Sequence, residues 1–106
     1  MVVLPGSFTM KLFVDDLRSA PDATWVVART ADEAIEYLST GQVVELSLDH
    51  DLGHPKKDGL YIVNWIERSA RKGDLQLPVV LIHSANPVGR YNMERTLRAI
   101  RRFIGE

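Results

Sequence analysis

Short apolar runs of strand length alternate with helix-like segments along this chain, and this alternation constrains the fold more than any other feature. The helix-like segments carry apolar residues at helical spacing and are bounded by capping residues. Strands that alternate with helices form a parallel sheet with right-handed crossovers. The runs that we interpret as strands cover residues 10–14, 25–28, 43–48 and 79–82.

The segments between and after these runs predict three helices. The first begins at a capping box in residues 30–33, the second is capped by Asp58, and the last covers about residues 88–104. Only ten residues, 15–24, separate the first two runs. A parallel crossover normally needs a dozen or more residues. The first connection therefore holds a single helical turn or no helix.

These elements predict an α/β fold with three layers around a parallel four-stranded sheet. The expected strand order is 2-1-3-4, in which the first and third strands are neighbours. The 106 residues suffice for one core. We assign the domain to residues 10–106 and interpret residues 1–9 as a leader outside it, because Met10 followed by Lys11 looks like a natural start.

Composition excludes several classes of protein. The formal net charge of −1 provides no overall attraction to nucleic acids or membranes. Without cysteine there is no disulfide, no thiolate nucleophile and no cysteine-ligated zinc. No apolar segment reaches the length of a membrane span, and the first residues lack the basic start of a signal peptide. We therefore expect a cytoplasmic protein.

Polar and acidic side chains follow three of the four predicted strands directly. In a parallel sheet these strand ends share one edge, where open α/β folds bind their ligands. Carboxylates that converge there repel one another unless a cation lies among them, most simply Mg²⁺ or else Mn²⁺, or a phosphate-bearing substrate carried with one. The residues concerned are Asp15 and Asp16, then Asp49, His50 and Asp51, then His83 and Ser84.

The metal ligands that we expect are Asp15, Asp16, Asp49 and Asp51. Capping of a turn explains any one aspartate equally well, but it does not explain all four together. The catalytic residues that we expect are His50, Asp51 and His83. Each histidine can move a proton, bind metal, or donate to a buried backbone carbonyl. No spacing of ligands indicates zinc.

Four further residues are candidates for phosphate binding: Arg18, Ser84, Asn86 and Arg90. Arg18 either clamps a phosphate or pairs with the acidic residues beside it. Ser84 either contacts a phosphoryl oxygen or caps its loop. Asn86 suits the N-cap of the last helix, whose free N–H groups can also hold a phosphate that Arg90 reaches. The arginines of that helix either bind an RNA backbone or form a solvated face.

The order of these motifs resembles the receiver domain of response regulators over roughly residues 10–104. Receivers carry an acidic pair after the first strand, here Asp15 and Asp16. After the third strand they carry an aspartate followed by a proline and a glycine, with the spacing seen here in Asp51, Pro55 and Gly59. After the fourth strand they carry a pair such as Ser84-Ala85. The segments Val-Asp-Asp-Leu-Arg, Leu-Asp-His-Asp-Leu-Gly and His-Ser-Ala-Asn-Pro resemble a divergent family, the cyclic-phosphate processing receiver domain. The resemblance implies a truncated flavodoxin-like, receiver-like fold and phosphoester chemistry. Receivers end a fifth strand in a lysine, which has no counterpart here by position.

Three functions are compatible with these features. The first, which we favour, is a metal-dependent phosphoesterase for a small cyclic phosphate or a 2′,3′-cyclic RNA end. Its basis is the surplus of polar residues, Asp49, His50 and His83, over those that a receiver needs. The second is a signalling module phosphorylated on Asp51. The third is a non-catalytic interaction domain whose exposed sheet edge joins a homodimer.

Overall fold

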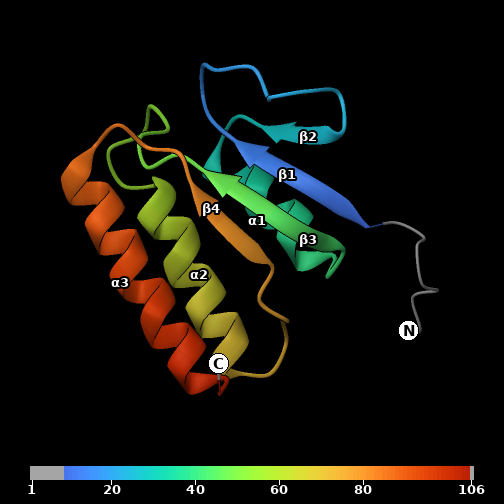
Figure 1. Ribbon diagram of the computed structural model, residues 1–106, viewed down its shortest axis with the longest axis vertical. Helices are drawn as coiled ribbons and strands as arrows, with labels where there is room; N and C mark the ends of the chain where they lie inside the picture. The colour runs from blue at the N-terminus through green and yellow to red at the C-terminus, as the bar shows by residue number, and fades with distance from the viewer. Residues whose placement is uncertain (1–8, 106) are drawn as a thin grey trace.

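The computed structural model describes residues 9–105. These residues form a four-stranded parallel sheet and three helices (Figure 1). The leader expected over residues 1–9 lies outside the described residues, apart from Thr9. The elements in chain order are β1 (Met10–Val14), β2 (Trp25–Ala28), α1 (Ala31–Ser39), β3 (Val43–Leu48), α2 (Gly59–Arg71), β4 (Val79–Ile82) and α3 (Pro87–Phe103).

The predicted parallel sheet, its order β2-β1-β3-β4 and the receiver-like fold class are confirmed. Val14 pairs with Leu48, and Leu48 pairs with Ile82, so the last residues of β1, β3 and β4 are in register. The arrows of these strands point to the same edge in Figure 1. The residues that directly follow these three strands therefore lie close together at the carboxyl edge of the sheet.

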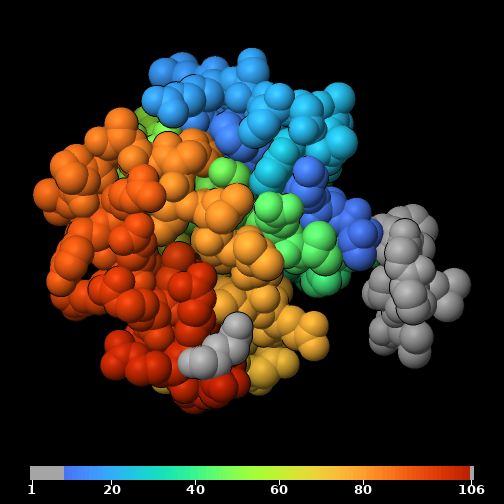
Figure 2. Space-filling model, in the orientation of Figure 1, coloured from blue at the N-terminus to red at the C-terminus, as the bar shows by residue number. Residues whose placement is uncertain are grey.

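Of the three layers that we expected, the described residues form two. Core residues of the sheet such as Leu12 and Leu46 pack in one cluster with Leu38 of α1, Ile62 of α2 and Leu97 of α3. On the opposite face Val79 and Leu81 remain 63% and 48% exposed, and Figure 2 views this face.

Crossover handedness explains the missing layer. The connections from β2 to β3 and from β3 to β4 run in the same direction across the sheet, so right-handed crossovers place their helices on the same face. Only the connection from β1 to β2 runs the other way. As predicted, residues 15–24 contain no helix, and so this connection adds no layer to the other face.

Side-chain caps start all three helices at the positions that the sequence predicts. A cap oxygen accepts a backbone N–H that the first turn would otherwise leave without a partner. Because two of the caps lie in the loops after β3 and β4, they also fix the start of α2 and of α3 next to the shared strand edge. The cap bonds are Glu33 to Thr30 at 3.1 Å, Tyr61 to Asp58 at 2.9 Å and Gly89 to Asn86 at 3.0 Å.

Candidate functional site

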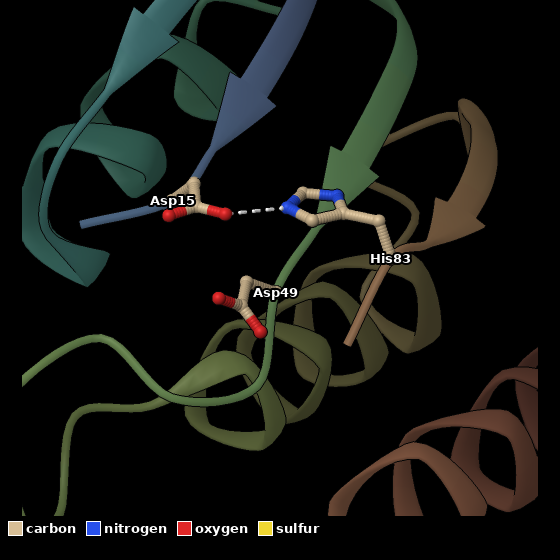
Figure 3. A group of neighbouring side chains, drawn as sticks. All are labelled: Asp15, Asp49 and His83. Carbon is tan, nitrogen blue, oxygen red and sulfur yellow. Dashed lines mark hydrogen bonds and ion pairs between the residues drawn. The ribbon is translucent and has the colours of Figure 1, made fainter. Parts of the chain in front are cut away.

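Side chains from three different strand ends meet at the carboxyl edge of the sheet (Figure 3). Asp15 follows β1, Asp49 follows β3 and His83 follows β4, and one potential ligand atom of each lies within 4.8 Å of the others. Hydrogen bonds of the sheet continue past the strands, from the Asp49 N–H to the Val14 carbonyl at 3.0 Å and from the His83 N–H to the Leu48 carbonyl at 3.1 Å. The sheet itself therefore fixes this group, which we call the Asp-Asp-His cluster.

Asp15 is the most deeply buried member of the cluster, with 1% of its surface exposed. Its Oδ1 accepts the backbone N–H groups of Leu17 at 2.9 Å and Arg18 at 2.8 Å, and its Oδ2 lies 3.0 Å from His83 Nε2. Burial raises the pKa of Asp15, but these hydrogen bonds and the His83 ring outweigh it, so that its pKa lies below the ordinary value. Asp15 is thus a carboxylate at neutral pH, with one oxygen held by the turn and the other directed into the cluster.

His83 is held on three sides. Its ring stacks on Phe13 with centroids 4.5 Å apart and planes 4° from parallel. Its Nδ1 lies 2.8 Å from Ser47 Oγ, and its Nε2 faces Asp15. In metal sites a neighbouring oxygen commonly holds the second ring nitrogen in this way and so fixes the tautomer and ring orientation.

Asp49 completes the cluster. Of the two predicted aspartates after β3, Asp49 and not Asp51 belongs to it. Because β3 ends at Leu48, Asp49 and Asp51 do not alternate along a regular strand. The Asp49 carboxylate lies beside the Asp15–His83 pair in Figure 3, and its Oδ1 accepts the N–H of His50 at 2.8 Å. The side chain of Asp51 is 68% exposed and lies outside the cluster.

His50 belongs to a second group, at the starts of α2 and α3. Its Nδ1 lies 3.0 Å from Asp51 Oδ1, and its Nε2 lies 3.4 Å from Asp58 Oδ2. Asn86 Nδ2 approaches the same ring at 3.5 Å. Gly89 packs so closely that a Cβ there would lie 2.3 Å from His50 Cγ. His50 therefore ties the loop after β3 to both helix starts.

Two of the predicted residues lie in the connection between β1 and β2. Asp16 is half-buried beside Gly53, where an added Cβ would lie 3.3 Å from Asp16 Oδ2. Arg18 is exposed, and its carbonyl oxygen accepts Arg29 Nη1 at 2.6 Å. The same nitrogen donates to the Asp15 carbonyl at 3.0 Å. Arg29, which we did not predict as a site residue, thus holds this connection against the sheet.

The remaining predicted residues lie in the loop after β4 and at the start of α3. Ser84 is buried, and its Oγ accepts the Asn86 N–H at 3.1 Å, so it closes the loop. Asn86 caps α3 as expected. Arg90 is exposed and pairs through Nε with Glu94 Oε1 at 3.1 Å.

Sequence reasoning missed the residues that orient His83, namely Ser47 and Phe13. The sequence did contain a signal for Ser47, which is a polar residue in a mostly apolar strand. Ser47 comes two residues before Asp49, so the two side chains are expected on the same face of the sheet. The pairing of Phe13 with Ser47 across β1 and β3 brings both against the ring, and only the register reveals this.

The sheet order and the acidic ends of β1 and β3 define a receiver-like α/β domain. The chain belongs to the family of the cyclic-phosphate processing receiver domain, whose family model matches residues 10–99. This finding confirms the resemblance seen in the sequence and links the chain to the processing of cyclic phosphates. Comparisons with curated proteins and with solved structures gave no match. Within residues 9–105, no helix has the length and apolar character needed to cross a bilayer.

Proposed function

We propose that this domain is a divalent-metal-dependent phosphoesterase that acts on cyclic phosphates. The observation that carries the proposal is the Asp-Asp-His cluster, in which two carboxylates and an imidazole from separate strand ends converge within 4.8 Å. Carboxylates this close favour a cation between them. The family's link to cyclic phosphates supports the class of substrate.

The chemistry of the cluster fits a small divalent cation, with Asp15, Asp49 and His83 as its ligands. Carboxylate oxygens suit both Mg²⁺ and Mn²⁺, and the imidazole nitrogen adds a preference for Mn²⁺. The backbone N–H groups that hold Asp15 Oδ1 and the hydroxyl that holds His83 Nδ1 orient both ligands in advance. When bound, such a cation supplies neutralisation of the charge that develops on the phosphoryl oxygens.

The residues around the cluster supply proton transfer and positioning in this proposal. His50 is our candidate for proton transfer, because each of its ring nitrogens faces a carboxylate and one of these, Asp51, is exposed at the same edge. Arg18 and Arg90 are exposed and are our candidates for binding phosphate oxygens. Ser84 and Asn86 hold the loop that presents the first N–H groups of α3.

A hydrolysis assay with 2′,3′-cyclic and 3′,5′-cyclic nucleotides, in EDTA, Mg²⁺ or Mn²⁺, tests this proposal. We expect metal-dependent ring opening that Asp49→Asn or His83→Gln lowers by at least about 100-fold, because each removes a ligand. Asp74→Asn is a matched control, since this exposed aspartate lies in the loop after α2. Activity that neither EDTA nor Asp49→Asn changes would exclude the proposed mechanism.

The receiver family also supports a second candidate function, phosphorylation of an aspartate. Asp51 has the sequence spacing to Pro55 and Gly59, whereas Asp49 occupies the strand end in the cluster. Incubation with acetyl phosphate should then add about 80 Da, the mass of one phosphoryl group. Asp49→Asn and Asp51→Asn identify the acceptor by loss of the adduct. An unchanged mass in Mg²⁺ counts against this function and leaves the phosphoesterase untouched.

A further inference from the structure

Arginines gather on α3 beside the free edge of β4. α3 contains five arginines, one glutamate and no lysine, a net charge of +4 in a chain whose total is −1. The rest of the chain therefore carries a net charge of −5, so α3 stands out as a strongly basic helix in an acidic chain. Figure 2 shows the surface of α3 beside that of β4. A groove of about 450 Å³ between them is lined by Val80, Leu81, Ile82, Arg90, Glu94, Leu97, Arg98 and Arg101.

The groove and the candidate site are both built on β4 and the residues that follow it. Ile82 lines the groove, and the next residue is His83 of the Asp-Asp-His cluster. Arg90 lies in the first turns of α3, just after the loop from β4. From Arg90 to Arg101 the helix rises about 16 Å, enough for several successive phosphates of a single strand. The groove therefore leads away from the carboxyl edge of the sheet, and Arg90, Arg98 and Arg101 line it.

We propose that this groove binds the phosphodiester backbone of single-stranded RNA, so that the substrate is a strand that ends in a cyclic phosphate. This inference rests on the proposed function, because only a ribose end carries a 2′,3′-cyclic phosphate. A guanidinium group can donate two parallel hydrogen bonds to one phosphate. A helix whose basic residues are all arginine is therefore well suited to bind a phosphodiester backbone. Arg90 is engaged by Glu94, whereas within the described residues Arg98 and Arg101 have no carboxylate at ion-pair distance. Arg98 and Arg101 are the phosphate ligands in this proposal.

An exposed aromatic ring supports a nucleic-acid strand over an acidic peptide. Tyr91 is 57% exposed and lies two turns before Arg98, hence on the same side of α3. Exposed aromatic rings beside a basic groove stack bases without selecting their sequence. An acidic peptide would use the arginines alone and would have no need of the neighbouring phosphate site.

Fluorescence anisotropy with a labelled oligouridine that ends in a linear 3′-phosphate tests the inference. This probe has no cyclic bond, so its binding does not depend on turnover. Arg98 and Arg101 should contribute about −1.4 to the slope of log K against log salt, at about −0.7 for each phosphate contact. The double variant Arg98→Gln/Arg101→Gln should lose this part of the slope and bind at least about tenfold more weakly at low salt.

The matched control is Arg95→Gln/Arg102→Gln, which removes the same charge from the same helix outside the groove. This control variant should keep the slope of log K against log salt of the unmodified protein. Equal weakening of both double variants, or absence of RNA binding by the unmodified protein, would overturn the proposal. Tighter, Arg98-dependent binding of oligoglutamate would instead identify a protein-docking groove and would also overturn it.

The hydrolysis assay separates this inference from the proposed function. If both stand, Arg98→Gln/Arg101→Gln keeps its turnover of a cyclic mononucleotide but loses the preference for a cyclic-phosphate-ended oligonucleotide. The other outcome is that no form of the protein opens a cyclic phosphate, although the groove binds RNA with the expected dependence of log K on log salt. The RNA-binding proposal would then stand and the phosphoesterase proposal would be wrong.

Discussion

Gly59 begins α2 so close to the loop after β3 that the structure has no room for a Cβ. An added Cβ would lie 2.2 Å from the Asp49 carbonyl oxygen, 2.7 Å from Met93 Sδ and 2.9 Å from His50 Cα. Ordinary contacts between such atoms are about 3.5 Å or longer. Two of the three atoms are backbone, and the Gly59 N–H also donates to the His50 carbonyl at 2.7 Å. Gly59→Ala must therefore push the Asp49 segment away from α2 by about 1 Å.

The sign of the change in the free energy of unfolding shows whether helix propensity or overpacking dominates in Gly59→Ala. In an open helix this substitution stabilises by up to about 1 kcal/mol, because alanine is the better helix former. Overpacking costs about 1–3 kcal/mol, and rigid backbone neighbours place Gly59 at the upper end. We expect a net loss of about 2 kcal/mol, which a urea titration registers as a midpoint lower by roughly 1–2 M.

Gly41→Ala provides the control for the Gly59 experiment. Gly41 has a φ of 74° but nothing within 4 Å of an added Cβ, so the variant pays only for its backbone conformation, about 1 kcal/mol. Only Gly59→Ala should also weaken the binding of Mn²⁺, since it displaces Asp49. A Gly59→Ala midpoint equal to or above that of the unmodified protein would refute the packing that we describe.

Three further predictions concern groups around the cluster. Because the pKa of Asp15 is lower in the folded protein than in the unfolded chain, its contribution to stability is present above about pH 4 and is lost as the pH falls through the lowered value. Asp15→Asn should flatten the acid limb of stability measured by urea at a series of pH values, and an unchanged limb would contradict the assignment. Gly89→Ala should lower the melting temperature by about 4–8 °C for each kcal/mol lost, because its Cβ would meet the His50 ring at 2.3 Å; an unshifted calorimetric transition would show that the ring moves freely. Arg29→Ala should cost about 1 kcal/mol and speed proteolysis between β1 and β2, because it removes both hydrogen bonds that Arg29 Nη1 donates to that connection; an unaltered cleavage rate would argue against this role.

Local chemistry made most of the fold predictable. The starts of all three helices followed from Thr30, Asp58 and Asn86, whose side chains cap a helix wherever the chain can form one. The strand order followed from the alternation of elements. We predicted three layers, although the strand order and the missing helix in residues 15–24 already imply two, because right-handed crossovers that run in one direction place their helices on one face.

The candidate site was only partly predictable. Register brings Asp15, Asp49 and His83 to one edge, and the sequence indicated that meeting. The choice between Asp49 and Asp51 depends on where β3 ends, because a regular strand beyond Leu48 would have placed both side chains on one face. The separation of His50 from the cluster depends on its packing against Gly89, a contact between distant parts of the chain that periodicity does not encode.

Calorimetric titration of Mn²⁺ into the protein and three variants shows whether the Asp-Asp-His cluster is a metal site. We expect one ion per chain, bound at least about tenfold more weakly after Asp49→Asn or His83→Gln. Asp51→Asn should leave the affinity nearly unchanged, because Asp51 lies outside the cluster. Absence of binding, or a loss of affinity in Asp51→Asn as large as that in Asp49→Asn, would show that the Asp-Asp-His cluster is not the metal site.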